Sequence, residues 1–132
     1  MYQWGAMSVN RHLLGLIRRF GQADEPWLEA VRGEIGELID DCKRGDWDGY
    51  GAEPIKPRSI CMAIDYLDAL SRGGVARPEV GCCPSGCVEI DWVGENGDAR
   101  MILSFDPDDN GVACIYYSFL SERERHRGRV AL

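Results

Sequence analysis

Apolar residues recur every three or four positions in the first half of the chain and every second position in much of the second half. The helical spacing predicts three amphipathic helices, over residues 10–20, 25–43 and 57–71. Asp24 is a natural N-cap for the second of these, and Pro26 suits its first turn. We expect glycines to end the helices, at Gly21, at Gly45 and at the pair Gly73-Gly74.

The alternating pattern of the second half predicts an antiparallel β-meander. In VEIDW, Val88, Ile90 and Trp92 alternate with two acids, as in a half-buried strand. Further strands are expected over residues 99–105 and 112–119, with a short edge piece over 78–80. The connections GENGD and DPDDNG both contain Asn-Gly, a strong hairpin signal. Alternation alone does not say whether the strand aromatics Trp92, Tyr116 and Tyr117 face a core or a dimer seam.

Helices followed by antiparallel strands indicate an α+β fold. We expect two layers, with N-terminal helices packed on a C-terminal antiparallel meander of three to four strands. The 132 residues suffice for a single domain with one hydrophobic core. We divide 1-132 into an N-terminal helix or arm (1-23), a helical part (24-72), a β-meander (78-120) and a charged tail (121-132). That tail, SERERHRGRVAL, is expected to be a charged helical turn or a loose end.

The negative charge is concentrated in one quarter of the chain. From Asp24 to Glu53, ten acidic residues and three basic ones leave −7, which equals the net charge of the whole chain. Such a balance argues against nonspecific nucleic-acid binding and favours a partner protein with a basic surface. No apolar run approaches the roughly 20 residues of a membrane span, and no signal cleavage site appears. We therefore expect a cytoplasmic protein of a bacterial host cell, without membrane contact.

Cysteines provide the first candidate chemistry. The segment GCCPSGC places Cys82, Cys83 and Cys87 close enough to bind a soft metal such as zinc. Zinc normally takes four ligands, and the two histidines, His12 and His126, lie at opposite ends of the chain. We therefore expect a Pro-Ser-Gly turn with reduced thiols, and no metal or other cofactor.

Two other kinds of site are weak in this sequence. DPDDNG matches the first half of a calcium loop, but the twelfth position, which needs a bidentate acid, is Tyr117. A hairpin turn accounts for the same residues. No nucleophile elbow, phosphate loop or dinucleotide fingerprint occurs. We therefore expect a protein that is not an enzyme.

The predicted second helix carries a row of acids. Glu34, Glu37 and Asp41 share one side of it, flanked by Glu29 and Asp40. Their spacing of about 5 to 10 Å is comparable with the roughly 6 to 7 Å between phosphates of a nucleic-acid strand. This face can therefore be read as a mimic of nucleic acid, or simply as a solvated helix face.

The segment GDWDGYGAEPIKP, which follows this helix, is interpreted as a structural corner. Trp47 is expected to plug the core, Gly49 and Gly51 to permit the bend, and Pro54 to stiffen the approach to the third helix. The acids of the segment would extend the negative helix face. A corner does not need Tyr50, so we expect a binding role for this loop to centre on that residue.

The run WDGYGAEPI, the helix after it, Pro78-Glu79-Val80, a Pro-x-Gly turn and VEIDW together resemble a group of small uncharacterised bacterial and phage-type proteins. That group shares a W-D-G-Y-G-A-x-P motif. The resemblance covers residues 45 to 119 and departs from the pattern at Pro84-Ser85-Gly86, where Pro-Asp-Gly is usual. It implies a fold unit and a mobile-element context, and no reaction.

The sequence thus predicts a small non-enzymatic protein-binding domain, encoded by a phage or mobile element. Its acidic helix would block the basic, nucleic-acid-binding surface of a host nucleoprotein defence complex, in the manner of an anti-CRISPR protein. One alternative is a toxin–antitoxin or immunity-type partner that binds through the sheet face, with Tyr116 and Tyr117 exposed. A second alternative is a cysteine-rich zinc protein, and the sequence also leaves a homodimer open.

Overall fold

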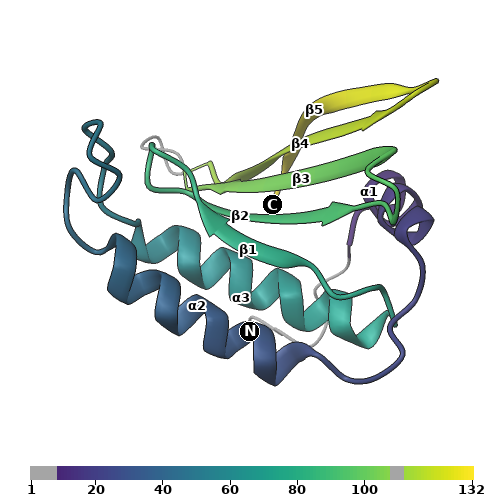
Figure 1. The fold of residues 1–132 in the computed structure, drawn as a ribbon, viewed down its shortest axis with the longest axis horizontal. Helices are drawn as coiled ribbons and strands as arrows, with labels where there is room; N and C mark the ends of the chain where they lie inside the picture. Colours follow the sequence, from purple (N-terminus) through teal and green to yellow (C-terminus); the bar gives the residue numbers. More distant parts are fainter. Residues whose placement is uncertain (1–8, 108–111) are drawn as a thin grey trace.

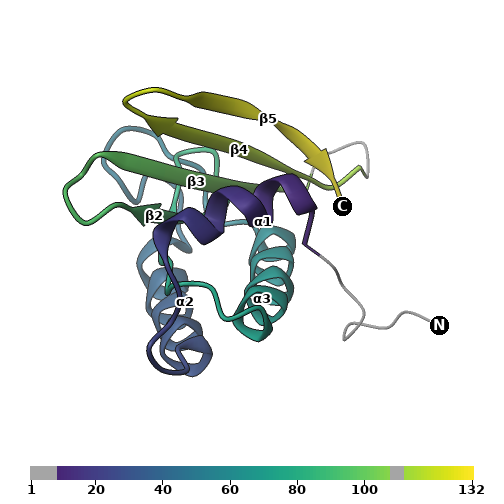
Figure 2. The ribbon, with the colours of Figure 1, turned by 90° about the vertical axis from the view of Figure 1, so that its right-hand side faces the viewer.

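The described residues form two layers, a sheet and the helices α1, α2 and α3, which all lie on one side of it (Figures 1 and 2). It is seen in a computed structural model that describes residues 9–107 and 112–132. Helices precede strands along the chain, so the predicted α+β class is confirmed. Within the described residues, no helix has the length and apolar character needed to cross a membrane.

The first helix, α1 (Arg11–Ile17), is followed directly by a 3-10 turn, η2 (Arg18–Phe20). The Asn10 side chain accepts hydrogen bonds from the backbone N–H groups of His12 and Leu13, which caps α1. Gly21 ends the segment with a φ of 96°, a conformation that favours glycine. The predicted first helix and its stop are therefore confirmed.

The other two helices are α2 (Leu28–Cys42) and α3 (Pro57–Arg72), which run antiparallel beneath the sheet (Figure 1). The predicted cap at Asp24 is wrong, because α2 begins only after Trp27. The Trp27 ring is buried, and its indole N–H donates to the Val75 carbonyl at 2.9 Å. Ala23 donates its N–H to the Gly74 carbonyl. These contacts hold the preceding residues out of the helix.

The sheet has five antiparallel strands in the order β1-β2-β3-β4-β5. They are β1 (Glu79–Cys82), β2 (Val88–Val93), β3 (Ala99–Asp106), β4 (Cys114–Ser121) and β5 (Arg125–Ala131). The sheet therefore has one strand more than the upper end of the predicted three to four. The tail at 121–132 is not a helical turn or a loose end, because its residues pair with β4 from Cys114↔Ala131 to Leu120↔Arg125. Charged and less polar residues do alternate along this tail, but the charged ones are arginines, so no apolar alternation indicated a strand.

The core lies between the sheet and the helices. Each of the three central strands contributes every second residue to it, in the buried sets Val88, Ile90 and Trp92, then Met101, Leu103 and Phe105, then Ile115 and Phe119. One polar side chain is fully buried there, that of Ser59 on α3. Its hydroxyl donates to the Phe105 carbonyl at 2.6 Å and accepts from the Val88 N–H at 2.7 Å. Ser59 thus joins α3 to β2 and β3.

The two predicted hairpin turns have different outcomes. In GENGD, Gly97 has a φ of 69° and donates its N–H to the Gly94 carbonyl, so glycine is required at the turn. In DPDDNG, residues 108–111 lie outside the described part of the chain. The calcium interpretation of that loop is therefore not tested, although Tyr117, at its twelfth position, does lie within β4.

Candidate functional site

The corner loop, residues 45–56, connects α2 to α3 and has its own internal hydrogen bonds. The Asp48 carboxylate accepts from the N–H groups of Tyr50 and Ala52, at 2.8 and 3.1 Å. The Asp46 carboxylate accepts from the N–H of Gly51 at 2.7 Å. These acids therefore hold the loop in shape, and their role is not limited to the predicted extension of the negative helix face.

The corner loop is also docked on the turn between β1 and β2. Glu53 donates its N–H to the Pro84 carbonyl and Lys56 donates its N–H to the Gly86 carbonyl, both at 2.8 Å. A Cβ atom on Gly86 would lie 2.3 Å from the Pro54 carbonyl oxygen. The absence of a side chain at Gly86 therefore allows the loop and the turn to meet.

Trp47 differs from its predicted role as a core plug. It is only half-buried and packs at the edge of the core, and its indole N–H donates to the Glu53 carbonyl at 2.7 Å. The tryptophan thus closes the base of the loop. Gly49 and Gly51, with φ of 78° and 84°, confirm the prediction that glycines permit the bend. Pro54 contributes the carbonyl that approaches Gly86.

Tyr50 stands at the tip of this loop with 92% of its surface exposed, the highest value among the exposed large hydrophobic residues described. The tip projects beyond the ends of α2 and α3 (Figure 1). An aromatic ring in water on a hydrogen-bonded loop does nothing for the core. It is the kind of rigid side chain that anchors protein interfaces at low entropic cost.

The acidic face of α2 comprises Glu29, Glu34, Glu37, Asp40 and Asp41. Four of the five are exposed, but Glu34 is half-buried and pairs with Arg77. Glu29 pairs with Arg32 at 3.2 Å, and Asp40 pairs with Lys43 at 3.6 Å. Glu37 and Asp41 form no ion pair with any residue that the structure describes. The uncompensated charge therefore lies in the last turns of α2, next to the corner loop.

Four cysteines gather where α2 ends against the β1–β2 turn. Their side chains interact in two pairs, Cys42 with Cys82 and Cys83 with Cys87. Cys42 was not expected here, because it stands far from the others in the sequence. No three His, Cys, Asp or Glu side chains within residues 9–107 and 112–132 are placed to hold a metal ion. The turn predicted for GCCPSGC is present, with Gly86 donating its N–H to the Cys83 carbonyl at 2.9 Å.

The Cys83–Cys87 pair is electrostatically unequal. Hydrogen bonding from Cys87, with a further contribution from the Ser85 hydroxyl 2.9 Å away, lowers the pKa of Cys83 to about 5. The same hydrogen bond and burial raise the pKa of Cys87 above its usual range. Burial raises the pKa of Cys82 to about 12. One thiolate therefore forms in this cluster near neutral pH, and it is Cys83.

The two tyrosines of β4 lie on opposite faces of the sheet. Tyr116 is 44% exposed on the side away from the helices. Tyr117 points toward α1, where its ring centroid lies 5.7 Å from that of His12. His12 also meets His126, with ring centroids 5.4 Å apart, so the fold brings together histidines from the two ends of the chain. A partner on the open side of the sheet would touch Tyr116 and not Tyr117.

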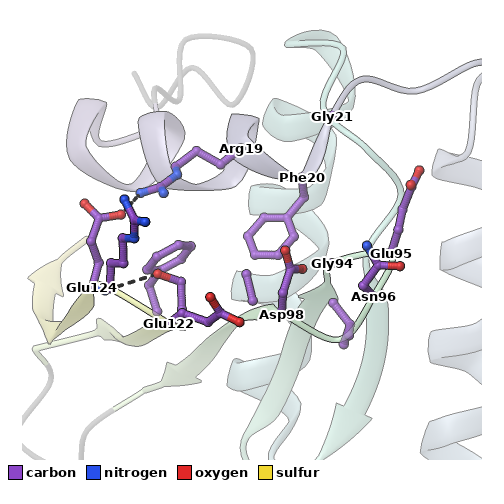
Figure 3. A pocket seen from close by; sticks show the side chains of 14 residues that line it. Arg19, Phe20, Gly21, Gly94, Glu95, Asn96, Asp98, Glu122 and Glu124 are labelled. Atoms are coloured by element: carbon purple, nitrogen blue, oxygen red, sulfur yellow. Dashed lines mark hydrogen bonds and ion pairs between the residues drawn. The ribbon is translucent and has the colours of Figure 1, made fainter.

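A cleft of about 830 Å³ opens where η2, the β2–β3 turn and the β4–β5 turn meet (Figure 3). Arg19 pairs there with Glu124, and its guanidinium carbon lies 4.9 Å from the centre of the Phe119 ring. Glu95, Asp98 and Glu122 add further acids to the rim. The described residues that line it include no histidine, cysteine or lysine, so the usual pairs of nucleophile and base are missing.

Sequence reasoning could not find this cleft, because three segments distant in the chain build it. Comparison of the chain with protein-family models, with curated proteins and with solved structures finds no match in any of the three. The resemblance to proteins with the W-D-G-Y-G-A-x-P motif therefore stays a prediction.

Proposed function

We propose that this chain is a non-enzymatic protein-binding domain that docks one end of its helical layer on a basic surface of a partner protein. The docking end comprises Glu37 and Asp41 in the last turns of α2 and Tyr50 at the tip of the corner loop. All three are exposed, and they lie at the same end of the molecule because the loop begins where α2 ends (Figure 1).

The exposure of Tyr50 carries this proposal. Its surface is 92% exposed although the loop beneath it is held by carboxylate and backbone hydrogen bonds on both sides of the residue. A tyrosine presented in this way loses little conformational freedom on binding, because its backbone is already ordered. Tyrosine is also among the residues most enriched at the energetic centres of interfaces.

The unpaired acids Glu37 and Asp41 determine which end of the molecule attracts a basic surface. Glu37 and Asp41 are not neutralised by any described residue, whereas Glu29, Glu34 and Asp40 have basic neighbours. Negative potential at this end favours encounter with a basic surface and raises the association rate at low salt. The interaction should therefore weaken as salt concentration rises.

In its specific form, the proposal is that the partner is a host nucleoprotein defence complex, such as a CRISPR effector, and that the docking end occupies its nucleic-acid groove. The acid spacing on α2, comparable with that of phosphates, supports this form. The motif resemblance supports an origin in a phage or mobile element and action inside the bacterial cell.

Two variants test the proposal, one that reverses the charges of Glu37 and Asp41 and one that removes the Tyr50 ring. We expect Glu37→Lys with Asp41→Lys to abolish binding to a purified CRISPR effector–guide complex, measured by biolayer interferometry. Tyr50→Ala should weaken that binding about 30-fold, as the loss of an interface anchor does. In cells with an active CRISPR system, wild-type protein should restore phage plaques, and both variants should fail to do so.

The matched control is Glu95→Lys with Glu122→Lys. It changes the net charge by the same amount at exposed positions of the β2–β3 and β4–β5 turns, at the other end of the molecule. Circular dichroism verifies that every variant is folded. If the control and the α2 reversal weaken binding equally, only net charge matters and the docking end is refuted. If Tyr116→Ala is the one damaging change, the sheet face is the binding surface instead.

A further inference from the structure

The side of the sheet that faces away from the helices, here called the open face, is covered by no described element (Figure 2). Strand register decides which residues lie on it. Those of the last two strands are Tyr116, Ser118 and Leu120 on β4, opposite Arg129, Arg127 and Arg125 on β5. Their neighbours in the chain, such as Phe119, point into the core. The open face therefore displays three arginines in line along an edge strand.

Charge is unevenly distributed across the open face. The β1 and β2 side holds Glu79, Glu89 and Asp91, and Asp91 pairs with Arg100 of β3 at 3.4 Å. The three arginines of β5 are exposed, and none of them forms an ion pair with a residue in the described ranges. An anion approaching β5 would therefore meet guanidinium groups that have no competing carboxylate.

An exposed aromatic ring stands beside these cations. Tyr116 is 44% exposed and is the direct cross-strand partner of Arg129. A hollow of about 460 Å³ lies here, lined by Tyr116, Tyr117, Ser118, Arg127, Gly128 and Arg129. A Cβ atom on Gly128 would lie 3.0 Å from the Tyr117 hydroxyl, on the face opposite Arg127 and Arg129, so the glycine leaves room there for the Tyr117 ring. The Tyr116 ring and the two guanidinium groups thus border one shallow site.

We propose that the open face along β4 and β5 binds single-stranded nucleic acid. Arg125, Arg127 and Arg129 would contact successive phosphates, and a base would stack on Tyr116. Strand geometry places alternate residues about 6.6 Å apart, close to the roughly 6 to 7 Å between phosphates of an extended strand. Guanidinium groups form bidentate hydrogen bonds to phosphate, and bases stack on aromatic side chains with little dependence on the nucleotide sequence.

The net charge of −7 does not oppose this site, because the charges are segregated. The acids that set the net value lie on α2 and the corner loop, whereas β5 belongs to the opposite layer (Figure 1). Charges more than about 10 Å apart are largely screened at physiological salt. An acidic protein would also be attracted to the arginines, but it would not present phosphates at the regular spacing of the β5 arginines together with a base that stacks on Tyr116. The combination of Tyr116 with the arginines therefore favours nucleic acid.

Fluorescence anisotropy with labelled oligouridylate and oligothymidylate of about twelve nucleotides tests the site. With three phosphates neutralised, the wild-type affinity should fall about 18-fold between about 50 and 200 mM salt. Arg127→Ala with Arg129→Ala should reduce that loss to about 3-fold, because only one phosphate contact remains. Tyr116→Ala should weaken binding about 5-fold or more at every salt concentration and leave the salt dependence unchanged.

Arg44→Ala with Arg58→Ala is the matched control, since both arginines are exposed in the helical layer and their loss removes the same two charges. It should leave both affinity and salt dependence unchanged. The proposal is overturned if neither oligonucleotide binds, or if Arg44→Ala with Arg58→Ala lowers the affinity as much as Arg127→Ala with Arg129→Ala. It is also overturned if Tyr116→Ala has no effect while a polyglutamate peptide binds as well as the oligonucleotides. A preference for one oligonucleotide identifies RNA or DNA as the ligand.

Self-association is measured in parallel by sedimentation velocity. If the arginines instead hold the acidic α2 of a second copy, the wild type will be oligomeric, Arg127→Ala with Arg129→Ala will be monomeric, and oligonucleotides will not dissociate the oligomer. That result overturns the proposal. The docking end and the open face lie on different layers, so Glu37→Lys with Asp41→Lys should not weaken oligonucleotide binding, and either proposal can fail without the other.

Discussion

Gly86 is where the corner loop and the β1–β2 turn depend on each other most closely. It has a φ of 85°, and a Cβ atom added to it would lie 2.3 Å from the Pro54 carbonyl oxygen. Gly86→Ala must therefore push the loop away from the turn. That movement breaks the two backbone hydrogen bonds, from Glu53 to Pro84 and from Lys56 to Gly86, which dock the loop.

The expected cost has two parts. A non-glycine residue in the left-handed region costs about 1 to 2 kcal/mol. Loss of two backbone hydrogen bonds adds about 1 kcal/mol each, so the free energy of unfolding should fall by about 3 to 4 kcal/mol. For a chain of this length, that corresponds to a drop in Tm of about 10 °C or more. Thermal unfolding followed by circular dichroism measures it.

Gly97→Ala separates the two parts. Gly97 also has a positive φ, of 69°, but a Cβ atom there would meet nothing within 4 Å. This variant should therefore lose only the backbone term, about 1 to 2 kcal/mol. Gly86→Ala should also speed trypsin cleavage after Arg44, at the start of the displaced loop, more than Gly97→Ala does. Equal losses of stability in the two variants would refute the clash and with it the argument that Gly86 holds the loop.

Two further predictions concern the core and the cysteines. Ser59→Ala removes the two hydrogen bonds that join α3 to β2 and β3, and it leaves two buried backbone groups unsatisfied. The free energy of unfolding, measured by chemical denaturation, should therefore fall by about 2 to 5 kcal/mol. Ser71→Ala, which removes a part-buried bond within one helix, should cost under about 1 kcal/mol, and a similar cost for Ser59→Ala would contradict its bridging role. Because the pKa of Cys83 is lowered to about 5, its alkylation by iodoacetamide should be near its plateau at pH 7 and decline as pH falls through about 5. Cys87→Ala, which removes the hydrogen-bond donor, should slow that reaction at pH 6.5. Faster labelling of the exposed Cys61 than of Cys83 in the wild type, seen by peptide mass spectrometry, would refute the lowered pKa.

Helices and the order of layers could be predicted from the sequence, because their signals are local. The apolar spacing of Ile60, Ala63, Leu67 and Leu70 places one face of α3 on the core wherever the rest of the chain lies. The period of two in VEIDW likewise indicates a strand with one buried face. The predicted start of α2 was wrong, because the position of Trp27 is set by its hydrogen bond to the distant Val75 and not by its neighbours in the sequence.

The candidate sites were predicted less completely, because their partners are distant in sequence. The acids of α2 were correctly expected on the helix surface, but the ion pair of Glu34 with Arg77 depends on how α2 lies against the loop before β1. Asp46 and Asp48 are the exception, because they bind backbone groups of their own loop only two to five residues away. The cysteine cluster gained Cys42 only because α2 ends beside the β1–β2 turn.

The sequence by itself determined the α+β class, the helix faces, the local turns and the concentration of acids between Asp24 and Glu53. Those features depend on residues a few positions apart. Only the tertiary structure decided that the tail is a fifth strand, that its arginines share one open face with Tyr116, and that Tyr50 stands alone in water. The reason is that strand partners and sheet faces are set by register between distant segments, and an arginine-rich stretch becomes a strand only when a neighbour satisfies its backbone.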